Sequence, residues 1–163
     1  MAVRLNLGCG QKIWPGFVNV DLADNTSGFK PDVCADLRSL PFPDDYADEA
    51  YAIHVLEHFY LWDVPGVLQE WRRVLKPGGR LIVEVPCMDK VLVHFAKPKP
   101  NLQMTWLALY GDCDRKDPNM VHKFCYSRDQ LRVAFKNSGF KDVVVGEPQF
   151  HYKARDMRCE GTK

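Results

Sequence analysis

The chain contains no apolar run long enough to cross a membrane. A membrane-spanning helix needs about 20 consecutive apolar residues, whereas the apolar 46% of this 163-residue chain is interrupted throughout by polar residues. The opening residues, MAVRLNLGCG, also lack the basic start and cleavage site of a secretory signal. From these absences we expect a cytoplasmic protein that does not contact the membrane.

Concentrated positive charge and closely paired cysteines are absent too. The 22 basic residues are balanced by 21 acidic ones. Without a basic run to follow a phosphate backbone, nucleic acid is not expected as a partner. None of the six cysteines forms a C-x-x-C pair, which argues against a zinc knuckle or a disulfide framework. We expect reduced thiols, most of them in or near the core.

What the chain does contain is a series of short apolar segments separated by turn residues. Nearly continuous, β-branched runs of this kind are typical of strands buried on both faces of a parallel sheet. They read, in order, VRLNL, FVNVD, PDVCAD, EAYAIH, RLIVEVP and DVVVGE. The length suits a single α/β domain covering residues 1–163.

Helices are predicted between the later segments. One begins near Asp63, with a proline in its first turn, and ends at the turn of residues 76–79. A second starts with an S-x-x-Q capping box at Ser127 and ends at Gly139. A weaker pattern predicts a third helix over about residues 102–110. Alternating strands and helices form a sheet whose ligands bind at the carboxyl ends of the strands.

Four of the predicted strands end in residues suited to hold a small ligand. Gly8-Cys9-Gly10 follows the first strand, and its glycines let the backbone approach a ligand closely. Asp21 ends the second strand and offers a carboxylate to a ribose diol. After the third strand, Asp36 and Leu37 offer a carboxylate and a backbone N–H to the amino edge of adenine. The fourth ends in HVLEH, residues 54–58. Singly, each has an ordinary structural reading; together they indicate one site.

A family resemblance is carried by five features that occur in a consistent order and spacing. They are LNLGCG, the aspartate ending the second strand, ADLRSLPFPDDYADEAYAIHVLEHF, EWRRVLKPGGRLIVEVP and HKFCYSRDQLRVAFKNSGF. The chain resembles the class I S-adenosylmethionine-dependent methyltransferases, particularly small, type 11-like bacterial or phage-type members. The resemblance implies a three-layer, doubly wound, mostly parallel seven-stranded sheet of the Rossmann-like methyltransferase fold.

The resemblance also implies a cofactor, S-adenosylmethionine, with S-adenosylhomocysteine as the product. The glycines would pass under its methionine part, and Asp21 would bind the ribose hydroxyls. Asp36 and Leu37 would hold adenine, and His54 would begin the loop that closes over the cofactor. The candidate cofactor-binding residues are Asn6, Gly8, Cys9, Gly10, Asp21, Asp36, Leu37 and His54.

A nicotinamide dinucleotide is the main competing cofactor, because it uses the same glycine turn and ribose carboxylate. Its fingerprint requires a third glycine that opens a helix under the pyrophosphate, and Ile13 stands at that position. Only about ten residues separate Gly10 from Asp21, too few for a full helix and a strand. The pyrophosphate would have no helix to bind.

The segment HVLEH also fits H-x-x-E-H, an inverted zinc signature that would make the chain a zinc-dependent hydrolase. That site needs His54 and His58 on one face of a helix, whereas His54 ends a predicted strand. We therefore predict no metal site. A protein that binds S-adenosylmethionine as a sensor or scaffold, without turnover, remains an open alternative because its cofactor contacts would look the same.

The helices that usually follow the first two strands are abbreviated in this chain. QKIWPG and LADNTSGFKP are loop-like, so one face of the sheet would lack local helices. We predict that an insertion at about residues 87–121, a partner subunit in a homodimer, or both cover that face. The same insertion would shape the acceptor site.

The acceptor is expected to be a small molecule or a glycan hydroxyl. Methyl transfer depends mainly on alignment and exclusion of water, so a catalytic base is optional. For a hydroxyl acceptor, a nearby histidine could take the proton at neutral pH. His122, at the end of the insertion, is the favoured catalytic candidate, and His58 is the second.

Overall fold

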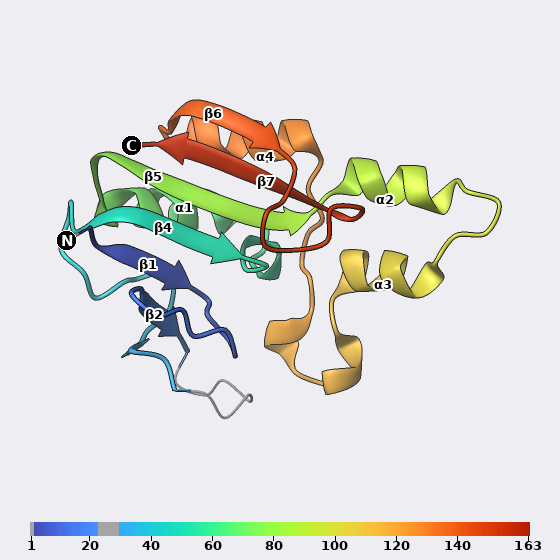
Figure 1. Ribbon diagram of the computed structural model, residues 1–163, viewed down its shortest axis with the longest axis horizontal. Coiled ribbons are helices and arrows are strands. Elements are labelled where there is room, and N and C mark those ends of the chain that lie inside the picture. Colours follow the sequence, from blue (N-terminus) through green and yellow to red (C-terminus); the bar gives the residue numbers. More distant parts are fainter. Residues whose placement is uncertain (1, 23–29) are drawn as a thin grey trace.

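The computed structural model describes residues 2–22 and 30–163, which contain one seven-stranded sheet (Figure 1). Its strand order is β3-β2-β1-β4-β5-β7-β6. β1 to β5 pair in parallel, and β7 runs antiparallel to both of its neighbours. The strands are β1 (Arg4–Leu7), β2 (Val18–Asp21), β3 (Val33–Cys34), β4 (Ala47–Ile53), β5 (Leu75–Pro86), β6 (Lys141–Gly146) and β7 (Asp156–Thr162). The predicted seven-stranded, mostly parallel fold is confirmed.

Four α-helices lie in the described part of the chain: α1 (Val64–Val74), α2 (Met88–Phe95), α3 (Leu102–Tyr110) and α4 (Arg128–Asn137). The three predicted helices correspond to α1, α3 and α4. The capping box of Ser127 and Gln130 is present at α4, whereas Asp63 stands at the N-cap of α1 without a side-chain capping bond. α1 ends at Val74, just before the predicted 76–79 turn, which lies inside β5.

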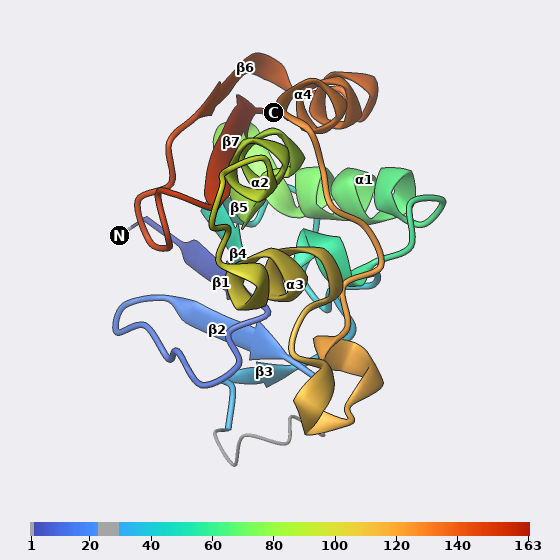
Figure 2. The ribbon, with the colours of Figure 1, turned by 90° about the vertical axis from the view of Figure 1, so that its right-hand side faces the viewer.

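Helices α1 and α4 cover one face of the sheet and enclose the main core (Figures 1 and 2). Alternate strand residues such as Ala50, Leu81 and Val83 belong to one buried apolar cluster with Trp71 of α1 and Phe135 of α4, and all five are fully buried. Burying a large apolar side chain contributes about 1.5–3 kcal/mol. This face therefore supplies much of the stability of the domain.

The other face of the sheet carries charged and aromatic side chains in place of a helical layer. Glu49 pairs with Arg80 at 2.5 Å, and Arg158 pairs with the buried Glu84 at 3.3 Å. Around Tyr51 of β4, an aromatic cluster is formed by Trp14, Phe17 and Phe150. The expectation of a face that is apolar and needs covering is wrong, because charged residues alternate with apolar ones along β4, β5 and β7.

The insertion lies beyond the carboxyl edge of the sheet and not over the open face (Figures 1 and 2). The prediction that it covers that face is therefore wrong. Short 3-10 turns, η2 (Cys113–Arg115) and η3 (Pro118–Met120), follow α3 and return the chain to α4. QKIWPG is a loop, as predicted. Of the predicted loop LADNTSGFKP, residues 23–29 lie outside the described residues.

Among the residues described, no helix has the length and apolar character needed to traverse a bilayer.

Candidate functional site

The glycine loop after β1 packs directly against the loop after β4. Gly8 has a φ of 68° and Gly10 a φ of 51°, in the left-handed region that favours glycine. A Cβ on Gly8 would lie 2.5 Å from Cγ2 of Val55, whereas a Cβ on Gly10 would meet no described atom within 4 Å. Gly8 thus allows the two strand ends to approach, and Gly10 leaves open space beside the loop.

Asp21, at the end of β2, fixes this glycine loop. One carboxylate oxygen accepts a hydrogen bond from the Gly10 N–H at 2.5 Å, and the other accepts from the Leu22 N–H at 2.7 Å. Asn6 supports the loop from β1: its buried side chain donates to the Lys12 carbonyl at 2.8 Å. Each Asp21 oxygen keeps a lone pair for a further donor, such as a ribose hydroxyl.

Burial keeps the thiol of Cys9 in its neutral form. Its thiol lies inside the glycine loop, and burial, reinforced by the nearby Asp21 carboxylate, raises its pKa to about 11. A thiol with so high a pKa is neutral at physiological pH and is a poor nucleophile.

The two predicted adenine-binding residues follow β3 and lie in different surroundings. Asp36 forms an ion pair with Arg38 at 2.6 Å, and the hydrogen bonds from Arg38 lower the pKa of Asp36. Leu37 is buried, and its carbonyl accepts a hydrogen bond from Nε1 of Trp71 at 2.9 Å. The hydrogen bond from Trp71 thus fixes Leu37 against α1. The Asp36 carboxylate is exposed, and a ligand that binds it in place of Arg38 would have to break this ion pair.

His54 lies between two buried carboxylates just after β4. Its Nδ1 is 2.9 Å from Oε1 of Glu57, and its Nε2 is 3.1 Å from Oδ2 of Asp156. Burial alone would lower its pKa, but the two carboxylates outweigh burial and raise it to about 9. His54 is therefore a cation at neutral pH, bridging two anions, and cannot act as a proton acceptor there.

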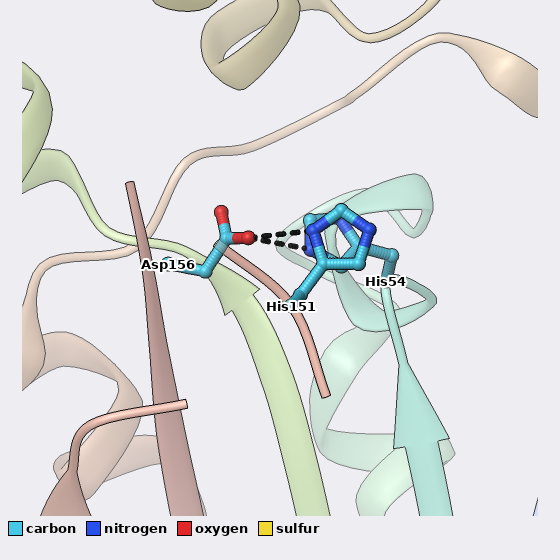
Figure 3. A group of neighbouring side chains, drawn as sticks. All are labelled: His54, His151 and Asp156. Carbon is cyan, nitrogen blue, oxygen red and sulfur yellow. Dashed lines mark hydrogen bonds and ion pairs between the residues drawn. The ribbon is translucent and has the colours of Figure 1, made fainter. Parts of the chain in front are cut away.

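Asp156, at the start of β7, collects several donors from the chain before it. Figure 3 shows both His54 and His151 directed at the same Asp156 oxygen, which His151 Nδ1 reaches at 2.8 Å. Nε of Arg155 donates to the other oxygen at 2.6 Å. Although burial opposes ionisation, these donors hold the pKa of Asp156 well below its usual range.

The two predicted catalytic histidines lie side by side. The ring centroids of His58 and His122 are 4.8 Å apart. Each directs Nδ1 at a backbone carbonyl, that of Val121 for His58 at 3.2 Å and that of Ala108 for His122 at 2.9 Å. Because a carbonyl only accepts, Nδ1 carries the proton in both rings and Nε2 is the basic nitrogen of the neutral form. Burial lowers the pKa of His122.

Glu57 completes this group and is fully buried. Its Oε1 lies 3.8 Å from Nε2 of His122 as well as 2.9 Å from His54. Although burial alone would raise it, the charge of His54 lowers the pKa of Glu57 to about 2. Within the described part of the chain, neither Glu57 oxygen accepts an aligned hydrogen bond. A buried carboxylate in this state has unused capacity to bind a cation or a donor.

The H-x-x-E-H reading of HVLEH does not match the geometry. Two groups of the described residues bring potential metal-binding atoms together, His54 with His151 and Asp156, and His54 with Glu57 and His122. Neither group contains both histidines of the motif. His54 has a left-handed φ of 58°, and His58 belongs to the 3-10 turn η1 (Leu56–His58), so the two imidazoles do not share a helical face.

Among the described residues, two of the cavities lie near the sheet. One of about 340 Å³ is bounded by Lys12 of the glycine loop and by Phe150, His151 and Tyr152. The other, of about 490 Å³, opens at the amino ends of β1, β4 and β5. Parallel α/β sheets bind ligands at the carboxyl ends of their strands, so the smaller cavity belongs to the candidate site despite its size.

Sequence reasoning missed the residues that β7 contributes. Asp156 is 102 residues from His54 along the chain, and no local pattern signals that contact. Arg155 and His151 were missed for the same reason. Glu57 stands out in the sequence only as part of a zinc motif. Its position between His54 and His58 could, however, have predicted that a carboxylate and histidines lie together.

The known proteins that this chain resembles include methyltransferases. The family model described as "Methyltransferase domain" matches residues 5–83. The chain is 32% identical over 119 residues to the ubiquinone/menaquinone biosynthesis C-methyltransferase UbiE of a Caulobacter species, covering 68% of this chain and 45% of the relative. It is 40% identical over 67 residues to the sterol 4-C-methyltransferase strm-1 of Caenorhabditis elegans, covering 41% of this chain and 18% of the relative.

Solved structures share the fold at lower sequence identity. A SAM-dependent methyltransferase from Archaeoglobus fulgidus superposes with a TM-score of 0.67 at 15% identity, covering 99% of this chain and 86% of that one. A possible histamine N-methyltransferase from Thermotoga maritima gives a TM-score of 0.63 at 18% identity, covering 100% of this chain and 83% of that one. The chain spans less than half the length of both curated relatives.

Proposed function

We propose that the chain is a class I S-adenosylmethionine-dependent methyltransferase, in keeping with the methyltransferase domain model that matches residues 5–83, and that it transfers a methyl group from S-adenosylmethionine to a small-molecule acceptor. The observation that carries the proposal is the convergence of four strand ends. β1, β2, β3 and β4 are parallel neighbours in the sheet, so their carboxyl ends lie at one edge, and the glycine loop, Asp21, Leu37 and His54 follow these strands in the chain. Enzymes that methylate small molecules, such as UbiE and the sterol methyltransferase, are among the relatives.

The residues at these strand ends fit the cofactor. Gly10 offers a backbone beside open space, which suits the methionine part, and Asp21 keeps acceptor capacity for the ribose hydroxyls. Leu37 forms an apolar wall for adenine, with Asp36 beside it once Arg38 is displaced. Asn6 and Cys9 hold the loop in shape, and His54 closes the far side.

When bound, S-adenosylmethionine supplies an activated methyl group: the acceptor's lone pair bonds to the methyl carbon as the sulfur–carbon bond breaks, and S-adenosylhomocysteine and the acceptor's proton are released. The chain has to align the acceptor and exclude water. We assign His58 and His122 to the acceptor side, because they join the loop after β4 to the end of the insertion. Nε2 of His58 has no partner among the described residues, so His58 is the better placed to take a proton.

Three further proposals concern the extent of the domain, its location in the cell and its oligomeric state. We propose a single domain of residues 1–163 in which the 87–121 insertion shapes the acceptor site. We also propose a cytoplasmic location, supported by free thiols at Cys34 and Cys113 on the surface, and a homodimer. Of the sixteen large apolar side chains exposed to solvent in the described part of the chain, seven lie on α2 and α3, and such a concentration is typical of an interface.

Calorimetry of the purified chain with S-adenosylmethionine, S-adenosylhomocysteine and NAD in parallel tests the proposal. We expect saturable binding of the first two and none of NAD. Asp21→Asn should weaken S-adenosylmethionine binding about tenfold or more, because a hydrogen bond to a charged group contributes about 1.5–3 kcal/mol. Asp129→Asn, an exposed substitution on α4, is the matched control. Binding of NAD alone would overturn the assignment.

A binding protein without turnover is the alternative from a different class. The same cofactor contacts would serve it, so calorimetry does not separate the two. Formation of S-adenosylhomocysteine in the presence of a mixture of small-molecule hydroxyl, amine and quinol acceptors does. If cofactor binding is tight and no acceptor yields product, the sensor or scaffold function takes the place of catalysis.

A further inference from the structure

A buried carboxylate without an aligned donor is costly, and Glu57 is such a group. Its side chain is fully buried, and both of its oxygens lack a hydrogen-bond partner within the described residues. Nearly all buried polar groups in folded proteins are hydrogen-bonded or bind an ion. Within the described residues, Glu57 has the ion pair with His54 at 2.9 Å but no aligned hydrogen bond, so its carboxylate keeps capacity for a metal ion on the side of the two histidines.

Both histidines present a nitrogen to that carboxylate and have the other nitrogen occupied. Nδ1 of His54 and Nε2 of His122 lie 2.9 and 3.8 Å from Oε1 of Glu57. The opposite nitrogen of His54 contacts Asp156 at 3.1 Å, and that of His122 contacts the Ala108 carbonyl at 2.9 Å. Metal-binding histidines show this pattern, because an acceptor on the second nitrogen fixes the tautomer and orients the ring.

The spacing of the three atoms suits a small ion. All of them lie within 4.8 Å of one another, and ligand atoms about 2.0–2.1 Å from a tetrahedral metal are about 3.4 Å apart. Imidazole nitrogen and carboxylate oxygen together favour first-row divalent ions over magnesium or calcium. We propose that His54, Glu57 and His122 form a binding site for a divalent first-row transition-metal ion, which would displace the proton from Nδ1 of His54 and leave Nε2 donating to Asp156.

The neighbouring group of potential ligands is a weaker candidate. His54, His151 and Asp156 also lie close together (Figure 3). The guanidinium of Arg155, however, already occupies that space. Its Nη2 is 3.0 Å from Nδ1 of His151, and its Nε is 2.6 Å from Asp156. A fixed positive charge repels a metal ion and satisfies the carboxylate, so this group orients His54 for the first site.

The position of the site suggests what the ion would do, and this part rests on the function proposed above. Three protein ligands leave an open coordination position. HVLEH packs on Gly8 through Val55, so the open position would lie beside the cofactor loop. A metal lowers the pKa of a bound hydroxyl, which points to acceptors that react through oxygen. His122 would then be a ligand, and His58 the remaining proton acceptor.

Manganese binding to the chelator-treated full chain tests the site directly. Mn²⁺ is the probe because zinc would also bind the free thiols, whereas manganese favours oxygen and nitrogen ligands. Electron paramagnetic resonance of free Mn²⁺ should report one saturable site. We expect Glu57→Gln and His122→Asn to weaken binding at least tenfold, and His94→Asn, a matched control on α2 that belongs to neither group of potential ligands, to change it less than twofold.

Three results would overturn the site: no saturable Mn²⁺ binding by the wild-type chain, unchanged affinity in Glu57→Gln and His122→Asn, or an equal loss in the control His94→Asn. Circular dichroism establishes that each variant is folded. If Glu57→Gln does not fold, His122→Asn decides the question. The assay contains no S-adenosylmethionine, so loss of the metal site with intact cofactor binding refutes this inference alone, and the reverse refutes only the proposed function.

Discussion

Gly8 links the geometry of the site to its sequence at the scale of single residues. Its φ of 68° would strain any other residue, and its α-hydrogen faces Val55 where a Cβ would collide. Gly16, with a φ of 78°, has the same kind of backbone, but a Cβ added there would meet no described atom within 4 Å. The two glycines therefore separate backbone strain from steric contact.

Gly16→Ala should lower the free energy of unfolding by about 1 kcal/mol, the cost of a left-handed non-glycine residue. Gly8→Ala should cost more, about 2–4 kcal/mol, because it adds overpacking against Val55. The double variant Gly8→Ala, Val55→Ala should recover part of that difference. Urea denaturation measures all three. Equal costs for the two single variants would contradict the proposed contact between the β1 and β4 loops.

Part of the candidate site could be predicted from single residues, because strand ends are local features. Gly8, Asp21 and Leu37 each follow an apolar segment, and the parallel sheet places them at one edge. Their actual partners could not be predicted. Arg38 pairs with Asp36 two residues away, a choice that depends on side-chain rotamers. Asp156 meets His54 only because β7 returns beside β5.

At the scale of elements, α1 fixes the loop that follows β3. Glu70 accepts a hydrogen bond from the Leu40 N–H at 2.7 Å. Arg73 donates to the carbonyls of Leu40 and Phe42 at 3.2 and 2.9 Å, and the two side chains also bond to each other. Glu70 and Arg73 together hold residues 40–44 against α1. Because Leu37 lies just before this segment, the same contacts help to fix its position.

Replacing Glu70 should make stability less dependent on pH on the acid side. The hydrogen bond from Arg73, with that from Leu40, lowers the pKa of Glu70. A carboxylate with a depressed pKa stabilises the fold above its unfolded pKa, about 4.3, and that contribution is lost as pH falls through the folded value. Glu70→Gln should cost about 1 kcal/mol at pH 7 and reduce the loss of stability below pH 4.

Thermal denaturation from pH 7 down to pH 3 measures both effects. Asp129→Gln is the control, since Asp129 is an exposed acid on α4 that bonds only to Arg132 among the residues described. If the stability of Glu70→Gln falls with pH in parallel with that of the wild type, the contacts of Glu70 with Arg73 and Leu40 contribute nothing to acid sensitivity.

Helix ends were predictable where side chains supply the signal, and α2 was not. α4 begins at a capping box, which the sequence states outright. α2 follows β5 directly at Cys87, whose side chain makes no capping bond, and Val91 is its one buried residue. Met88, Val91, Leu92 and Phe95 do recur at helical spacing, but with no cap or breaker between β5 and α2 this short segment was not separated from the strand before it.

For the whole molecule, charged and apolar side chains alternate along β4, β5 and β7, and this alternation decides which face of the sheet must be covered by helices. Glu49, Arg80 and Glu160 form ion pairs on the open face, and the same strands bury Ala50, Leu81 and Cys159 on the other. The apolar runs of the sequence predicted the number of strands, but nearly continuous patterns concealed this two-sidedness. The open face of the sheet therefore needs no cover, and the exposed apolar surface that remains for a partner lies on α2 and α3 of the insertion.

A homodimer formed through α2 and α3 predicts concentration-dependent sedimentation. Val93 and Trp106, which are 69% and 48% exposed, would be buried between subunits. Val93→Glu and Trp106→Glu should each shift the chain toward monomer at micromolar concentration. Val133→Glu, 52% exposed on α4, should not. A wild-type chain that sediments as a monomer up to about 100 micromolar, a concentration on the scale of a weak complex, would contradict the dimer.

The strand order has a consequence for how the protein matures. β7 lies between β5 and β6 although it follows both in the chain, so during synthesis β5 keeps an unpaired edge after β6 has been made. The Asp156 side of His54 is empty until β7 pairs with its neighbours. A nascent chain paused before β7 is made would already contain the glycine loop. It would still expose the unpaired edge of β5, and His54 would lack Asp156. Chaperones should therefore bind mainly at the β5 edge.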